Sequence, residues 1–182
     1  GIVDKANLAW DRSDGPNRGR VYLVHTDAVT LPDTNIILWY SDNNGMNWTK
    51  RLMPVNDDGT TNSQFFPSIA VDQSSGNVGV GWHSGVENND VTRFVATISD
   101  DGGSTFRVAY LVSPGKSDST DVSLDSNGAL FSYGDYTGIS FVDGMLQPIW
   151  ADNSIELRGV PDPRQFDVAN ARIAVAEVSR AI

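Results

Sequence analysis

Short runs that alternate hydrophobic and polar residues follow one another along the whole chain, and they are rich in Val, Ile, Tyr, Phe and Trp. Gly, Asp, Asn and Ser interrupt these runs roughly every ten residues. Alternation with a period of two is typical of β-strands, and little of the chain shows the 3.6-residue period of an amphipathic helix. The pattern therefore predicts an all-β fold made of short strands and tight turns.

Three segments of the chain repeat the same order of strands. In each segment one strand ends on an aspartate, the next opens on a glycine, and the third ends on a serine. The aspartates are Asp11, Asp72 and Asp143, the glycines are Gly19, Gly76 and Gly144, and the third strands "NIILWYS", "RFVATIS" and "RIAVAEVS" end at Ser41, Ser99 and Ser179. Tandem antiparallel units of this kind are typical of β-propeller blades. We expect blade 1 at residues 1–63, blade 2 at 64–120, and an incomplete blade 3 at 121–182 that lacks its outer strand.

A turn motif follows the third strand in the first two units: "SDNNGMNW" from residue 41 and "SDDGGSTF" from residue 99. In such a turn the Ser hydroxyl and the Asp carboxylate accept hydrogen bonds from backbone N–H groups, a glycine supplies a positive φ, and the aromatic ring packs beneath the turn. We therefore expect a structural role for Ser41, Gly45, Trp48, Ser99, Asp101, Gly103, Thr105 and Phe106.

The second turn resembles the Asp box of the sialidase-like, or BNR-repeat, family, S-x-D-x-G-x-T-[FW], and matches it at every position. In the first copy Asn43 and Asn47 replace the Asp and the Thr. The stretches "DKANLAWD", "QFFPSIAVD" and "GDYTGISFVDGMLQPIWAD" also resemble members of this family. The resemblance implies a six-bladed propeller of which this chain holds the C-terminal half. It also implies a partner, namely the missing N-terminal half, with a second copy of the chain as the alternative.

The resemblance further implies an active site. Sialidases use a tyrosine nucleophile polarised by a glutamate, an aspartate as acid and base, and three arginines that hold the substrate carboxylate; a neutral phenol avoids repulsion by an anionic sugar. On this basis Tyr136 is the candidate nucleophile of a retaining glycoside hydrolase and Arg93 a candidate carboxylate clamp, while Asp4 stands nearest to the glutamate position. In the alternative interpretations, Tyr136 is packed between blades, and Arg93 lies on an exposed strand and pairs with an acidic side chain at the surface.

Aromatic residues end the second strands of the repeats: Trp82 and Trp150, with His25 at the matching place in the first unit. If these ends face the channel mouth, the rings would stack on sugar rings; if they face the next blade, they belong to the core. The acidic loops at 56–59 and 87–90 lack the spacing of an EF-hand, so we expect no metal or other cofactor, with calcium at these loops as the alternative.

The 182-residue chain has a formal net charge of −10, which opposes binding to nucleic acid or to an anionic membrane surface. No apolar stretch approaches the roughly 18 residues of a membrane-spanning helix, and cysteine is absent. The family resemblance implies an extracellular or cell-surface protein. Two functions remain open: a glycan-processing hydrolase, or a non-catalytic propeller that binds carbohydrate or protein. The acidic net charge favours the second, because an anionic substrate would meet a mostly anionic surface.

Overall fold

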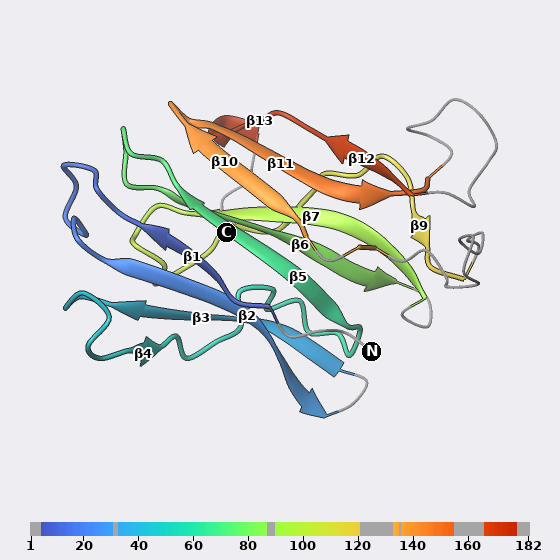
Figure 1. Cartoon of the computed structure of the whole chain (residues 1–182), viewed down its shortest axis with the longest axis horizontal. Helices are drawn as coiled ribbons and strands as arrows, with labels where there is room; N and C mark the ends of the chain where they lie inside the picture. Colours follow the sequence, from blue (N-terminus) through green and yellow to red (C-terminus); the bar gives the residue numbers. More distant parts are fainter. Residues whose placement is uncertain are drawn as a thin grey trace.

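The computed structural model describes residues 5–30, 33–86, 90–120, 133–134, 136–154 and 166–177. Its elements are β-strands and one short 3₁₀ helix, so the all-β prediction is confirmed. The strands form three antiparallel sheets that follow one another along the chain, here called sheets 1, 2 and 3 (Figure 1). Within the described ranges no helix has the length and apolar character needed to cross a membrane.

Sheet 1 contains β1 (Asn7–Trp10), β2 (Val21–Thr30), β3 (Asp33–Ser41) and β4 (Thr49–Lys50), paired in chain order. Sheet 2 contains β5 (Gln64–Val71), β6 (Val78–Val86), β7 (Val91–Ser99) and β8 (Tyr110–Leu111) in the same order, and β9 (Ser117–Asp118) also pairs with β7. Sheet 3 contains β10 (Gly138–Val142), β11 (Met145–Asp152), β12 (Asp167–Asn170) and β13 (Ile173–Ala174), and both of the last two pair with β11. The exact blade boundaries remain a prediction, because 121–132 and 155–165 lie outside the described residues.

The third strand of the last repeat differs from the prediction of one strand over 172–179. The structure divides this pairing between β12 and β13, and the chain then enters a 3₁₀ helix at Val175–Glu177. The backbone N–H of Val175 donates to the carbonyl of Gly144 at 2.9 Å, and the Val175 carbonyl accepts a bond from the Arg107 guanidinium at 2.6 Å. These bonds hold Val175, where the 3₁₀ helix begins, against Gly144 and Arg107. Ser179 lies outside the described residues.

Two apolar layers hold the three sheets together, because alternate side chains of each strand point to opposite faces. Between sheets 1 and 2 the buried layer contains Tyr22, Val24, Ile36, Leu38, Val55, Ile69, Val71, Val78, Val80 and Trp82. Between sheets 2 and 3 it contains Ala96, Ile98, Phe141, Leu146 and Ile173. Gly79 allows the second approach, since a Cβ there would lie 2.3 Å from Leu146 Cδ1. Each fully buried large apolar side chain contributes about 1.5–3 kcal/mol.

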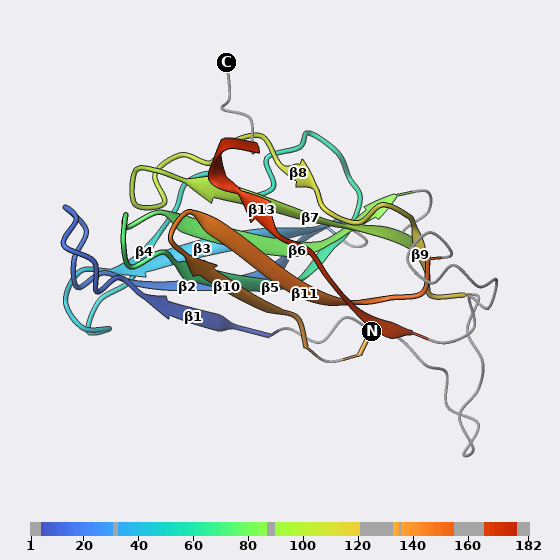
Figure 2. The same cartoon turned by 90° about the horizontal axis from the view of Figure 1, so that it is seen from above.

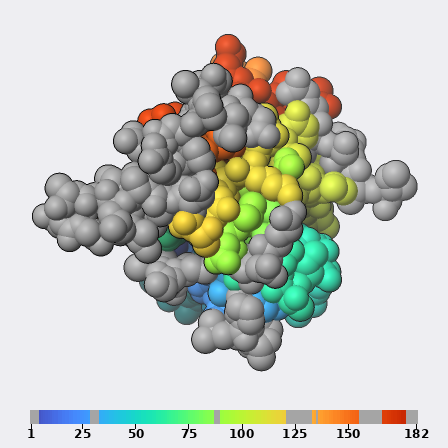
Figure 3. Space-filling view, turned by 90° about the vertical axis from the view of Figure 1, so that its right-hand side faces the viewer, coloured from blue at the N-terminus to red at the C-terminus, as the bar shows by residue number. Residues whose placement is uncertain are grey.

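The first strands of the three sheets lie side by side. β5 contacts β1 on one side and β10 on the other. Figure 2 shows β1 and β10 on one side of the molecule and β8 on the opposite side. Seen end-on in Figure 3, the yellow segment that includes β9 lies between the blue-to-teal residues of sheet 1 and the orange-to-red residues of sheet 3. Because β5 lies between β1 and β10, the starts of these three strands come together at one place.

The turn from Ser99 to Phe106 is closed by its own polar side chains. The Ser99 hydroxyl donates to Asp101 Oδ1 at 2.8 Å and accepts the Gly103 N–H at 2.8 Å, while Thr105 Oγ1 donates to Asp101 Oδ2 at 2.6 Å. Partial burial opposes ionisation of Asp101, but the hydrogen bonds from Thr105 and Ser99 outweigh it, so the pKa of this carboxyl lies below its usual value. In the first turn Asn43 takes the same place, accepting from the Ser41 hydroxyl at 3.0 Å and from the Asn47 N–H at 2.9 Å.

The same turn fastens sheet 2 to sheet 1. Gly103 has a φ of 86°, and a Cβ there would lie 2.8 Å from Leu38 Cδ2 in sheet 1. Arg20 donates to the Gly102 carbonyl at 2.9 Å and Arg51 to the Ser104 carbonyl at 3.1 Å. Close approach and positive φ together explain why glycine occupies position 103.

Apolar side chains are exposed on the two sheet faces that point away from sheet 2. On sheet 1 these are Leu8 and Trp10 of β1, and on sheet 3 they are Val142, Ile149 and Val168. The alternation along each strand places them opposite the residues of the buried layers. We call these two surfaces the outer faces.

Candidate functional site

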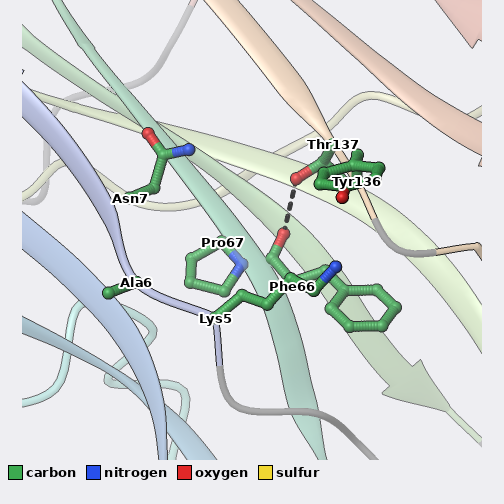
Figure 4. Close-up of a pocket in the computed structure, with 7 residues that line it drawn as sticks. All are labelled: Lys5, Ala6, Asn7, Phe66, Pro67, Tyr136 and Thr137. Atoms are coloured by element: carbon green, nitrogen blue, oxygen red, sulfur yellow. Dashed lines mark hydrogen bonds between the residues drawn. The ribbon is translucent and has the colours of Figure 1, made fainter.

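A pocket of about 330 Å³ lies where the three first strands come together (Figure 4). The lining residues come from three places: Lys5 and Ala6 precede β1 and Asn7 is its first residue, Phe66 and Pro67 lie on β5, and Tyr136 and Thr137 precede β10. Two aromatic rings, an ammonium group and two polar side chains therefore surround one cavity. This pocket is the candidate functional site.

The β5 wall of the pocket is an irregular piece of strand. Phe65 pairs with His83 and Ser68 pairs with Gly81, so two residues, Phe66 and Pro67, oppose the single residue between them on β6. Such a β-bulge bends the strand, and proline fits there because it has no N–H to donate to a ladder. Phe66 has a φ of 52°, in the left-handed region. The bulge therefore changes the direction of the side chains at the pocket.

A hydrogen bond joins this bulge to sheet 3. The Thr137 hydroxyl donates to the Phe66 carbonyl at 2.8 Å, drawn as the dashed line in Figure 4. The bulge leaves this carbonyl outside the regular ladder, where a side-chain donor reaches it. The bond fixes the segment that carries Tyr136 against β5.

Tyr136 stands at the mouth of the pocket with 82% of its surface exposed. The Lys5 ammonium lies 4.0 Å from the centre of its ring, a cation–π contact worth about 0.5–1 kcal/mol at an exposed site. Such exposure argues against the alternative in which Tyr136 is packed between blades. The exposed Tyr136 ring and the Lys5 side chain both line the pocket.

Arg93, a second candidate catalytic residue, is not brought to this pocket. Arg93 lies on β7 opposite Ser84, is half-buried, and does not line the cavity. β6 separates β7 from the first strand of the sheet, β5. Asp4 lies outside the described residues. The roles of Arg93 and Asp4 remain predictions from the family resemblance.

The two candidate stacking tryptophans are buried. Trp82 is 1% exposed and donates to Gln64 Oε1 at 2.8 Å, and Trp150 is 2% exposed and donates to Asp152 Oδ2 at 3.1 Å. Trp150 also stacks on Phe94, with 4.8 Å between ring centres. Both indoles contact protein partners, which favours the core alternative over sugar stacking.

His25 is also not among the residues that line the pocket. Its Nε2 accepts a hydrogen bond from Trp39 Nε1 at 3.1 Å, and its Nδ1 lies 2.9 Å from the Thr26 carbonyl. These partners require the proton on Nδ1 and leave Nε2 as the acceptor. The observed contacts therefore give His25 a role in sheet 1.

An aromatic cluster supports the bulge from behind. His83 is buried, stacks on Phe65 at 5.2 Å, and lies 4.8 Å from the ring of Tyr133. Burial lowers the pKa of His83 to about 3, against a smaller opposing effect of Asp152, so the imidazole is neutral. The edge of Phe66 meets Phe65 at 5.2 Å. The wall of the pocket thus packs against an uncharged aromatic layer.

The described residues contain no group of three His, Cys, Asp or Glu side chains placed to hold a metal ion. In the loop at 56–59, Asn56 Oδ1 accepts the Ile36 N–H at 2.9 Å and Asp58 Oδ2 accepts from Gln64 at 3.0 Å. These two oxygens, which were candidate calcium ligands, accept hydrogen bonds from within the protein. The other acidic loop, 87–90, lies mostly outside the described residues.

Neither a family model nor a curated protein sequence matches this chain. Solved structures do resemble it. An α-L-arabinofuranosidase of family GH93 from Fusarium graminearum, solved with arabinobiose, aligns over 93% of this chain and 44% of its own, at 14% identity and a TM-score of 0.59. A protein of unknown function from Dyadobacter fermentans aligns over 91% and 38%, at 16% identity and a TM-score of 0.56. A Hadza microbial sialidase aligns over 92% and 34%, at 14% identity and a TM-score of 0.55.

This likeness concerns the fold. It confirms the β-propeller prediction and places the chain's three sheets among the propeller folds that sialidases and arabinofuranosidases share. The chain spans less than half the length of these neighbours. Their substrates and activities belong to whole proteins more than twice as long.

Proposed function

We propose that this chain carries the ligand-binding pocket of a carbohydrate-binding propeller. The observation that carries the proposal is the meeting of the Phe66 and Tyr136 rings with the Lys5 ammonium in one cavity of about 330 Å³. Small-molecule sites occupy roughly 300–1,000 Å³ and combine apolar walls with a few polar groups. A cavity of this size matches one or two sugar rings.

Sugars suit this lining for a chemical reason. One face of a sugar ring presents C–H groups that pack on aromatic rings, and its edge presents hydroxyls that need donors and acceptors. The pocket offers both, with Asn7 and Thr137 as the polar side chains. The resemblance to an arabinofuranosidase and a sialidase supports the same ligand class. An extracellular or cell-surface location belongs to the same proposal.

Glycoside hydrolysis is the second candidate, and the exposed hydroxyl-bearing ring of Tyr136 favours it. In this reaction the phenol oxygen would bond to the anomeric carbon while the leaving oxygen takes a proton from an acid, and water would then release the sugar. The described lining contains no Asp or Glu to supply that proton, and Arg93 does not line it. Binding is therefore the first proposal.

Isothermal titration with a panel of neutral arabino-oligosaccharides and sialylated oligosaccharides tests the proposal. We expect at least one class to bind, Tyr136→Ala to weaken its affinity by about tenfold, and Tyr136→Phe to preserve it, because stacking needs the ring and not the hydroxyl. Tyr110→Ala on β8, which removes another exposed tyrosine, is the matched control. Absence of binding in every case, or equal binding by Tyr136→Ala, would contradict the proposal.

Release of reducing sugar, assayed in parallel, separates the two candidates. If the chain is an enzyme, Tyr136→Phe keeps affinity and loses turnover. If it is a binding protein, neither wild type nor variant shows turnover, while the affinities follow the pattern above.

A further inference from the structure

Phe66 adopts a backbone conformation that a bulky residue seldom takes. Its φ of 52° lies in the left-handed region, which glycine enters freely and large side chains avoid. It is also the first of the two bulge residues on β5. In bulges of this kind a left-handed first residue is usually glycine. The sequence therefore retains a strained residue where glycine would remove the strain.

Contacts on both sides hold Phe66 in this state. Its carbonyl accepts the Thr137 hydroxyl, and Pro67 follows it directly, which disfavours the right-handed helical conformation for the residue before it. Its ring meets Phe65 edge-on at 5.2 Å, with 79° between the ring planes. Phe66 is half-buried and is one of the residues that line the pocket.

Strained backbone that the surrounding structure holds in place often marks a functional position. We infer that Phe66 is the stacking platform of the pocket: the left-handed bulge is kept because it turns this ring toward the ligand, where it packs on the apolar face of a sugar ring. This inference rests on the proposed function. It assigns Phe66 as the residue that determines specificity, because the ring selects sugars that present a flat face of C–H groups. Lys5 contacts the ligand from sheet 1, and Tyr136 contacts it from sheet 3.

Three substitutions of Phe66 separate the effect of the backbone conformation from the effect of the aromatic ring. Phe66→Gly removes both the strain and the ring, Phe66→Ala removes the ring and keeps the strain, and Phe66→Tyr keeps the ring. We expect Phe66→Gly to melt about 2–4 °C above Phe66→Ala, the reverse of the usual order of these residues in a strand. We expect both to lose about tenfold or more in affinity for the oligosaccharide that wild type binds, and Phe66→Tyr to bind as wild type does.

Asp143→Gly is the matched control. Asp143 also has a positive φ, 50°, but it is exposed in a turn and does not line the pocket. This variant should gain stability and keep full affinity.

The outcomes distinguish the two claims. If wild type binds an oligosaccharide and Phe66→Gly binds it equally well, the platform is wrong and the proposed function stands. If Phe66→Tyr loses affinity as Phe66→Gly does, the platform is also wrong. If wild type binds no member of the panel, the proposed function fails, and the platform with it, whatever the melting temperatures show.

Discussion

The carboxylate of Asp72, at the end of the first strand of sheet 2, accepts the backbone N–H of Gly144 in sheet 3 at 2.7 Å. The same carboxylate accepts the N–H of Ser74 at 3.0 Å. At the opposite end of β5, the Phe66 carbonyl accepts the Thr137 hydroxyl. The two bonds fix β5 and β10 at both ends, and this pairing sets the position of the pocket walls.

Removing the first of these ties should destabilise the protein. Asp72→Ala removes a buried carboxylate and leaves the Gly144 and Ser74 amides without this acceptor, so we expect the free energy of unfolding to fall by about 1–3 kcal/mol. Urea denaturation followed by tryptophan fluorescence measures the loss. Asp14→Ala, which removes an exposed partner of Arg18, should change stability by less than about 0.5 kcal/mol. Equal effects of the two substitutions would contradict this role for Asp72.

Acid should weaken the fold in a window set by His83. Its folded-state pKa is lowered to about 3 by burial, whereas an unfolded histidine has a pKa of about 6.5. Below pH of about 6.5 the unfolded chain binds a proton that the folded chain does not bind until about pH 3, so stability is highest above this window and declines through it. The slope should approach about 1.4 kcal/mol per pH unit.

His83→Phe tests this window, since a phenyl ring fits the stack on Phe65 and cannot be protonated. We expect urea denaturation at pH 7, 6, 5 and 4 to show the decline in wild type and a much flatter profile in the variant.

Asp72 contributes to acid sensitivity in the same direction, but only at lower pH. Burial opposes its ionisation, but hydrogen bonds from Ser74 and Gly144 outweigh it and hold its pKa below the usual value, so its stabilisation is lost as the pH falls below about 4. If stability fell as steeply in His83→Phe as in wild type between pH 6 and 5, His83 would not be the group that sets this window.

The two turns predict which replacements the Asp101 position tolerates. Asn43 already performs the acceptor role of Asp101 in the first turn. Asp101→Asn should therefore cost less than Asp101→Ala, which leaves the Thr105 and Ser99 groups without their acceptor and should cost about 1 kcal/mol. Thermal unfolding monitored by circular dichroism ranks the two variants. A larger loss for Asn than for Ala would refute the comparison.

The outer faces should make the isolated chain associate. Within the chain, sheets pack through the same kinds of side chain that the outer faces expose, and soluble monomers seldom expose large apolar patches. We propose that another propeller sheet covers each face, which for this chain alone means a second copy. Light scattering should give a mass above the monomer's 19.7 kDa.

Charges on the outer faces should reverse that association. The double variant Leu8→Lys, Val168→Lys should return to the monomer mass, while Leu52→Lys should not, because Leu52 is 95% exposed but lies in the segment after β4 and not on an outer face. A monomeric wild type would rule out the second copy as the occupant.

Local patterns predicted most of the fold because a propeller sheet forms from strands adjacent in sequence. The alternation of hydrophobic and polar residues identified β5, β6 and β7, and the aspartate and glycine residues between the strands located their turns. The last strand was predicted less well, because its course depends on the distant Arg107, which binds the Val175 carbonyl. A contact of this separation leaves no local sequence signal.

The site was predicted only in part. Tyr136 came from the family resemblance, and the structure places it at the pocket. Lys5, Phe66 and Thr137 were missed because they meet only when three first strands come together. One local signal was present: a proline at position 67, inside an otherwise regular strand, indicates a bulge and thus an unusual residue beside it.

The most direct test of the carbohydrate pocket is the aromatic ¹H–¹³C spectrum of the chain, titrated with the oligosaccharide that binds in the panel. The account predicts that ligand shifts the ring signals of Tyr136 and Phe66, assigned from Tyr136→Phe and Phe66→Tyr, and leaves those of the exposed Tyr110 unchanged. Shifts confined to Tyr110 or to other rings away from the pocket, with Tyr136 and Phe66 unmoved at saturating ligand, would contradict it.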